Sequence, residues 1–226
     1  DVYKRQVLNG SVKYANERIQ FKTPISQFGA IKEKIARMAI DLYASESGCY
    51  RAASDIQNRI EDFKSDGKSP QESELKGLEE YAIECSIIKV FCSEAMQNSS
   101  DEGVQIFGGM GFSADTPMEA AWRDSRIGRI YEGTNEINRM VSVGMLLKKA
   151  AKGHLDLMNP IMQIVEKVKS NKFEKLNDNS EFAQEEFLVQ NIKDIFLLLT
   201  GAAFQKYGAD LENHQNNFQL SCLIVH

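Results

Sequence analysis

The chain has 226 residues, enough for one or two domains, and a net charge of −5. Hydrophobic residues make up 42% of it and charged residues 26%, which is typical of a globular protein. The negative charge, without a basic stripe interleaved with aromatic residues, gives no electrostatic case for binding nucleic acid. The longest nearly apolar run, residues 195–204, is too short to cross a bilayer, and no N-terminal segment has the charged-then-apolar layout of a signal peptide.

The four cysteines and three histidines show no spacing that is typical of a zinc site or a hydrolytic triad. We therefore expect no metal site, mostly buried free thiols and a reducing compartment. Cys85 and Cys92 are seven positions apart, so they share one face of a helix. The other two cysteines are Cys49 and Cys222.

Apolar residues recur every three or four positions through the first part of the chain, which predicts amphipathic helices and almost no strand. A first short helix covers about residues 8–20 and stops before Pro24. A long helix follows over about residues 31–63, and a loop at residues 65–70 ends it. A second long helix begins near residue 75 and continues past residue 95.

The two long helices need partners along their whole apolar faces, because about 30 helical residues span about 45 Å. The first helix and another that begins after Thr134 can supply these partners. We therefore expect an all-α, up-and-down four-helix bundle over residues 1–150. A second helical unit, cut short, occupies residues 151–226, with helices over about 160–169 and 184–207.

Three glycines, Gly108, Gly109 and Gly111, lie close together after the second long helix. Glycine permits tight turns and close approach of a ligand. No strand precedes them, so this is not a dinucleotide fingerprint. Their spacing fits either an ordinary turn or a loop that contacts a phosphate or cofactor.

Glu132 has two interpretations, a solvated loop charge or a base that takes a proton. Ile130 and Tyr131 could shield it, and Gly133 gives the backbone freedom directly after it. Thr134 is a good N-cap for the helix that follows. A carboxylate that an apolar ligand desolvates becomes a stronger base and can abstract a carbon-bound proton.

Three segments resemble the C-terminal helical domain of the acyl-CoA dehydrogenases. These are residues 14–38 (YANERIQFKTPISQFGAIKEKIARM), 104–112 (VQIFGGMGF) and 122–139 (WRDSRIGRIYEGTNEINR). Their order and spacing agree with that family along about 140 residues, and together they are highly specific. The unit after residue 150 resembles the longer, very-long-chain type.

The resemblance implies FAD-dependent α,β-dehydrogenation of acyl-CoA to trans-2-enoyl-CoA in fatty acid β-oxidation. Glu132 would remove the α-proton while the β-hydrogen leaves as hydride to the flavin. The backbone N–H of Glu132 and a flavin hydroxyl would polarise the thioester carbonyl. An electron-transfer flavoprotein or a similar acceptor would reoxidise the flavin.

The remaining site residues follow from the same resemblance. Tyr131 and Gly133 match substrate-side neighbours of the base. Arg18 matches an arginine that pairs with the FAD pyrophosphate of a neighbouring subunit, and an ion pair with Glu17 or another acid is the alternative. The other matches to cofactor-contacting positions are Phe21, Gln105, Gly109, Thr134 and Glu136.

The chain also departs from the family. Lys22 stands where a glycine is usual after Gln20 and Phe21, so we expect the turn there to be made otherwise. The N-terminal helical domain and the middle β-domain are absent, so we expect the chain to be a fragment that alone is inactive and holds FAD poorly. The polar start (residues 1–6) and uncapped end (residues 221–226) agree with a fragment carrying unrelated edge residues.

Two other readings stay open. A non-catalytic helical scaffold of the same fold would serve in assembly, and an oxidase on this fold would differ in how oxygen reaches the flavin. We expect a homodimer, with a tetramer as the alternative. Membrane contact is possible for the C-terminal unit, but the sequence shows no strongly basic amphipathic helix that indicates it. Bacterial cytoplasm and mitochondrial matrix both fit, and secretion does not.

Overall fold

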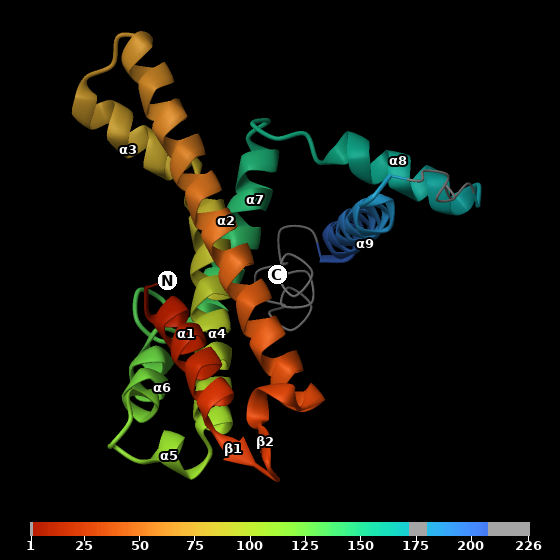
Figure 1. Cartoon of the computed structure of the whole chain (residues 1–226). Helices are drawn as coiled ribbons and strands as arrows, with labels where there is room; N and C mark the ends of the chain where they lie inside the picture. Colours follow the sequence, from red (N-terminus) through yellow and green to blue (C-terminus); the bar gives the residue numbers. More distant parts are fainter. Residues whose placement is uncertain (1, 172–179, 208–226) are drawn as a thin grey trace. The chain divides into compact units, whose positions relative to one another are not determined.

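The computed structural model describes residues 2–171 and 180–207, most of them helical. The expected all-α class is confirmed, since the only two strands in the described ranges are two residues long. The chain forms two compact units, Asp1–Asn138 and Arg139–His226 (Figure 1). Each unit is described by itself. Residues 221–226, which the sequence analysis interpreted as unrelated edge residues, lie outside the described residues.

The first unit consists of long helices joined by short connections. Its elements are α1 (Val2–Glu17), β1 (Ile19–Gln20), β2 (Thr23–Pro24), the 3-10 turn η1 (Ile25–Gln27), α2 (Gly29–Ser65), α3 (Pro70–Glu80), α4 (Ala82–Phe107), α5 (Gly109–Phe112) and α6 (Pro117–Ile127).

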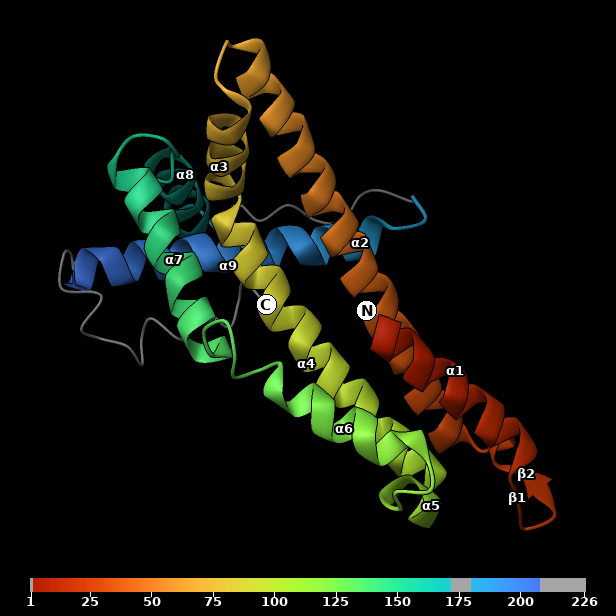
Figure 2. The ribbon, with the colours of Figure 1, turned by 90° about the vertical axis from the view of Figure 1, so that its left-hand side faces the viewer.

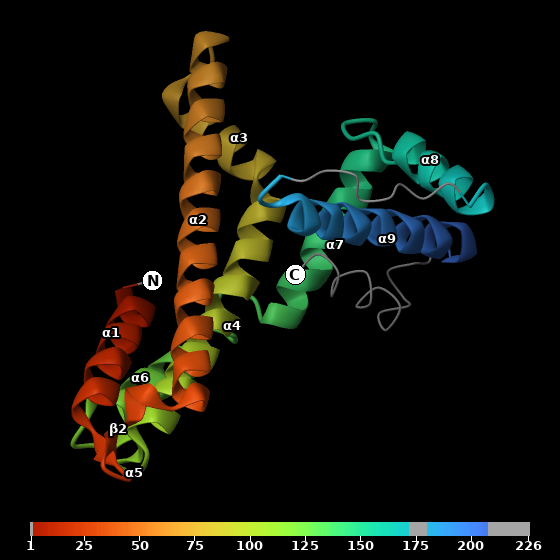
Figure 3. The ribbon, with the colours of Figure 1, turned by 45° about the vertical axis from the view of Figure 1, so that its right-hand side comes forward.

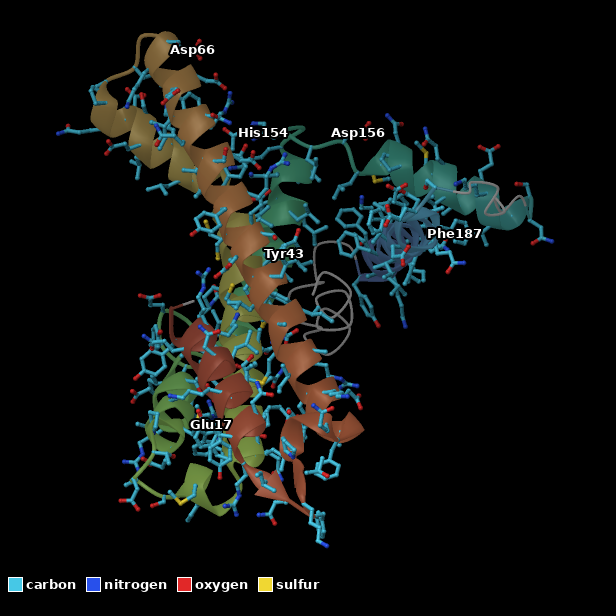
Figure 4. All side chains as sticks on the ribbon, viewed as in Figure 1. Glu17, Tyr43, Asp66, His154, Asp156 and Phe187 are labelled. Atoms are coloured by element: carbon cyan, nitrogen blue, oxygen red, sulfur yellow. The ribbon has the colours of Figure 1, made fainter. Side chains whose placement is uncertain are left out.

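The core of this unit lies where α1, α2, α4 and α6 pack along one another (Figures 1 and 2). The rings of Tyr14 and Phe107 stack with centroids 4.0 Å apart and join the end of α1 to the end of α4. Asp66 marks the turn from α2 to α3, and Glu17 lies far from it near the end of α1 (Figure 4). The buried apolar residues that cluster there are Val7, Ala15, Ile25, Met38, Ile106, Met118 and Ala121.

The helix predicted over residues 31–63 is confirmed as α2, but the second long helix is two helices. Tyr81 ends α3 and begins α4. The break lets α3 lie back against the end of α2, where Gly77 approaches Ile60 so closely that a Cβ would stand 2.5 Å from its Cγ1. This contact joins two different helices, so the apolar periodicity within one helix does not reveal it.

The structure contains two features that the apolar pattern did not predict. Residues 18–20, expected to be helical, leave α1 and enter a small antiparallel hairpin in which Gln20 faces Thr23. The other feature is α6, which begins at Pro117 after Thr116 and carries Glu119 in its first turn. A threonine, a proline and an acid in this order are typical of a helix start, so α6 was predictable.

The helix expected to complete the bundle after Thr134 is α7 (Asn135–Ala151), and it lies mostly in the second unit. Within the first unit, α6 is the helix that lies along α4 (Figure 2). The two compact units divide inside α7. The expected domain boundary at residue 150 stays a prediction.

The second unit contains most of α7 together with α8 (Met158–Lys169) and α9 (Ala183–Tyr207). Helices α8 and α9 lie side by side (Figure 3). The two later helices agree with those predicted over residues 160–169 and 184–207. A small core surrounds Val143 of α7 and includes Ala203 and Tyr207 of α9.

Among the described residues, α9 is the one helix long and apolar enough to cross a membrane, by length and composition alone. The sequence analysis did not predict this, because it considered only the ten-residue apolar run. The criterion for a membrane span is the mean hydropathy over 18 residues, which is longer than that run. One such helix is weak evidence, since core helices of soluble proteins meet the same criterion.

The hairpin turn places two non-glycine residues in the left-handed region, Phe21 with φ 51° and Lys22 with φ 66°. Left-handed backbone at both central positions is the two-residue hairpin turn that normally takes Asn-Gly. The chain therefore keeps the turn that a glycine would favour and accepts strain at Lys22.

We expect Lys22→Gly to raise the free energy of unfolding by about 0.5–1 kcal/mol, because glycine adopts left-handed backbone without a steric penalty. Urea denaturation measures this change. Lys22→Ala removes the same charge and keeps the strain, so it should bring no gain. Equal stabilisation by both substitutions would point to charge instead.

Candidate active site

The loop from Gly128 to Thr134, here called the glutamate loop, joins α6 to α7. Its first residues continue the turn of α6, since the N–H of Tyr131 donates to the carbonyl of Ile127 at 3.1 Å. The loop is closed where the N–H of Asn135 donates to the carbonyl of Arg129 at 3.1 Å.

Asn135 fastens this loop to the middle of α4. Its side chain is 1% exposed, and its Oδ1 accepts a hydrogen bond from Lys89 Nζ at 2.8 Å. Its Nδ2 lies 3.0 Å from Ser93 Oγ and donates to Glu94 Oε1 at 3.2 Å. Lys89 Nζ also donates to the carbonyl of Gly133 at 2.7 Å. Gly133 of the loop and Asn135, the first residue of α7, are thus tied to one face of α4.

Lys89 is a partly buried cation among acids. Burial lowers the pKa of its ammonium group, and the nearby carboxylates of Glu132, Glu136 and Glu94 oppose that change. Lys89 therefore places a positive charge close to the candidate base, in addition to holding its loop. The sequence analysis did not single out this residue, and no local pattern marks it.

Asn138 holds the loop from the other side. Its Nδ2 lies 3.3, 2.8 and 3.2 Å from the carbonyl oxygens of Glu132, Gly133 and Thr134. The N-cap predicted at Thr134 is confirmed, because its Oγ1 accepts from the N–H of Ile137 at 3.3 Å. Every carbonyl at the tip of the loop is therefore engaged.

The backbone at Glu132 is in the left-handed region, with φ 56°, and Gly133 follows with φ 80°. Such backbone costs a non-glycine residue about 1–3 kcal/mol and is found at functional sites more often than elsewhere. The hydrogen bonds to Lys89 and Asn138 stabilise it. Within the described part of the chain, the N–H of Glu132 donates to no protein acceptor.

Glu132 and Tyr131 line a cavity of about 230 Å³ against α4 and α6. Glu132 itself is exposed, and Tyr131 and Ile130 are 50% and 48% exposed, so this chain does not supply the shielding expected from them. The rest of the lining is Lys89, Cys92, Ser93, Met96, Asp124, Ser125 and Gly128.

A second group of candidate residues gathers where the hairpin and α5 lie, at the same end of the first unit (Figure 1). The stack of Tyr14 on Phe107 brings these segments together. Arg18 follows Tyr14 by one turn and donates its N–H to that residue's carbonyl at 2.8 Å. We call Arg18, Phe21, Gln105 and Gly109 the hairpin-end cluster.

The members of the hairpin-end cluster are all exposed. Within the described residues, the Arg18 guanidinium forms no ion pair, either with Glu17 or with another acid. The alternative interpretation of Arg18 as half of a surface ion pair therefore lacks support. Phe21 is 89% exposed and touches Phe28 edge to face at a centroid distance of 6.4 Å.

The three clustered glycines have different roles. Gly108 makes the turn after α4 with φ 61° and ψ −138°, a conformation open to glycine only. A Cβ on Gly111 would stand 2.4 Å from the carbonyl oxygen of Val104, so close packing requires glycine there. A Cβ on Gly109 would meet nothing within 4 Å. Gly108 thus serves the turn and Gly111 the close packing, while both Gly108 and Gly109 leave open space beside the backbone.

The structure therefore brings the predicted residues together in two places. Glu132 lies with Tyr131, Gly133 and Thr134 in the glutamate loop, and Glu136 follows in the first turn of α7. The hairpin-end cluster lies elsewhere, since Ser93 and Gln105 on α4 are separated by about 18 Å at 1.5 Å per residue.

We expect Asn135→Ala to lower the free energy of unfolding by about 1–3 kcal/mol, because it leaves buried partners on α4 without their hydrogen bonds. Urea denaturation followed by circular dichroism measures the loss. Asn58→Ala, at an exposed position of α2, serves as the control and should change little. A loss no larger than that of the control would mean that the loop does not depend on this amide.

The chain matches the family model of the acyl-CoA dehydrogenase C-terminal domain over residues 3–146. A probable acyl-CoA dehydrogenase of Bacillus subtilis (strain 168) is 42% identical over 211 residues, which are 93% of this chain and 35% of that protein. The mitochondrial very long-chain specific acyl-CoA dehydrogenase of Mus musculus is 38% identical over 136 residues, 60% of this chain and 18% of that protein.

The crystal structure of an acyl-CoA dehydrogenase from Bacillus anthracis complexed with FAD is similar to this chain, with a TM-score of 0.93 and 42% identity. The match covers 99% of this chain and 38% of that one. The chain thus spans about a third of the length of its bacterial relatives. On the family model and these relatives, the chain belongs to the acyl-CoA dehydrogenase family.

Proposed function

We propose that this chain carries the base of an FAD-dependent acyl-CoA dehydrogenase that converts acyl-CoA to trans-2-enoyl-CoA in fatty acid β-oxidation, with Glu132 as that base. The observation that carries the proposal is the conformation of the glutamate loop. Glu132 is held in left-handed backbone by hydrogen bonds to its own carbonyl and to that of Gly133, while its carboxylate and N–H stay open.

The carboxylate of Glu132 would accept the α-proton of the acyl-CoA. Exposed as it is, it meets water in this chain and becomes more basic only when a bound acyl group displaces that water. Tyr131 and Gly133 would contact the substrate beside it. The fixed loop keeps the carboxylate within reach of the proton, which is the first requirement of a general base.

The open N–H of Glu132 would donate to the thioester carbonyl of the same substrate. Loss of the α-proton moves negative charge onto that oxygen, and a donor already in place stabilises the charge. Because Lys89 and Asn138 hold the carbonyls around it, this N–H needs little reorganisation when the substrate binds.

The hairpin-end cluster suits a dinucleotide such as FAD. A guanidinium without an ion pair fits a pyrophosphate, an exposed aromatic ring fits a flat ring system, and Gly109 gives open backbone. Arg18, Phe21, Gln105 and Gly109 would hold the cofactor there, with Thr134 and Glu136 contacting it near the base. When bound, FAD supplies the hydride acceptor of the reaction.

The resemblance assigns Arg18 and Gln105 to the FAD of a neighbouring subunit. The separation of the two clusters along α4 supports this assignment. The glutamate loop would then serve the site of its own subunit, and the hairpin-end cluster the site of the neighbouring subunit. We therefore propose a homodimer, with an electron-transfer flavoprotein or similar acceptor as redox partner and bacterial cytoplasm or mitochondrial matrix as the location. Because the chain spans about a third of its relatives, its inactivity in isolation stays a prediction.

We expect Glu132→Gln in the full-length protein to lower kcat by several orders of magnitude, because an amide cannot accept the α-proton. Reduction of the flavin by acyl-CoA under anaerobic conditions, followed by absorbance, measures this step directly. FAD content should stay unchanged, since the substitution conserves shape.

Glu79→Gln, an exposed glutamate of α3, is the matched control and should leave the rate unchanged. A protein that acts only as a helical scaffold would give the same result for both variants. Equal flavin reduction by the Glu132 variant and the control would therefore reject Glu132 as the base.

A further inference from the structure

Two cysteines from different helices meet beside the glutamate loop. Cys49 of α2 and Cys92 of α4 have their sulfur atoms 3.7 Å apart, and both are partly buried. The sequence analysis paired Cys85 with Cys92 on one helix face and expected buried thiols. Cys85 is exposed, and Cys222 lies outside the described residues. The contact between Cys49 and Cys92 depends on how α2 packs against α4.

We propose that Cys49 and Cys92 are a redox modification site that closes a reversible disulfide on exposure to hydrogen peroxide. A disulfide has a sulfur–sulfur distance of about 2.05 Å, so the two atoms need to approach by roughly 1.7 Å. Small rotations of the two side chains can supply part of this approach, and a slight shift of α4 the rest. The two thiols are already neighbours, which gives their reaction a high effective concentration.

The cavity decides which thiol reacts first. Cys92 lines the 230 Å³ cavity together with Glu132, and Cys49 does not line it. Burial, and then the neighbouring Cys92, raise the pKa of the Cys49 thiol to about 11, so it is a poor first nucleophile at neutral pH. Peroxide that enters the cavity therefore meets Cys92.

The chemistry has two steps. In the first, the Cys92 thiolate attacks one peroxide oxygen, the O–O bond breaks, and hydroxide leaves and takes up the thiol's proton as water, which gives a sulfenic acid. In the second, the Cys49 thiolate attacks the Cys92 sulfur, the S–S bond forms as the S–O bond of the sulfenic acid breaks, and the departing hydroxide takes the Cys49 proton to become a second water. Two thiols are oxidised and one peroxide is reduced.

The site is linked to the glutamate loop through α4. Cys92 precedes Ser93, whose hydroxyl lies 3.0 Å from the Asn135 amide, and follows Lys89 by one turn. Drawing the Cys92 sulfur toward α2 moves this part of α4 relative to the loop. We expect the disulfide to loosen the attachment at Asn135.

The test uses the full-length protein, treated with a slight excess of hydrogen peroxide and quenched in acid with a thiol alkylating agent. Peptide mapping by mass spectrometry should find Cys49 joined to Cys92, with dithiothreitol restoring both thiols. Cys85→Ala serves as the control and should form the same bond. In Cys49→Ala, dimedone should capture Cys92 as its sulfenic acid.

Several results would overturn the proposal. One is oxidation confined to Cys85, and another is Cys92 passing to the sulfinic acid while Cys49 stays reduced. Formation of the bond without faster hydrogen exchange at the amides of residues 131–138 would reject the link to the loop. None of these measurements depends on Glu132 acting as a base, so the two proposals fail separately.

Discussion

The buried amide of Asn135 is the contact on which the candidate site depends. It joins the first residue of α7 to Lys89, Ser93 and Glu94 of α4, and Lys89 extends the attachment to the loop carbonyl of Gly133. A glutamate in left-handed backbone stores strain of about 1–3 kcal/mol, which only such surrounding contacts maintain. Without the attachment, Glu132 would lie on an ordinary mobile loop.

Helix α4 connects the two groups of candidate residues. Its middle turns hold the glutamate loop, and its last turn carries Gln105 near the hairpin and the glycine turn. An α-helix of 26 residues is a stiff spacer, so the separation of the two groups is set by its length. This rigidity suits a domain whose two ends contribute to the sites of two subunits, as we propose. It also explains why a change at Cys92 would reach the loop.

The apolar period predicted the helices of the bundle well because one face of each helix is buried. It failed where a contact from elsewhere in the chain overrides the local pattern. The break at Tyr81 accompanies the close contact of Gly77 with Ile60, and the hairpin replaces the last turn predicted for the first helix. The N-cap at Thr134 was predictable because a cap is a local hydrogen bond. The start of α6 carried a similar local signal.

The sequence by itself determined the all-α class, most helix positions and, through three short segments, the resemblance to one family. Only the tertiary structure decided which residues hold the candidate base, since Lys89 and Asn135 are distant in sequence and no local pattern joins them. It also separated the glycines by role and brought Cys49 to Cys92. The physical reason is that periodicity and caps report interactions within a few residues, whereas strain relief and side-chain pairing depend on how helices pack.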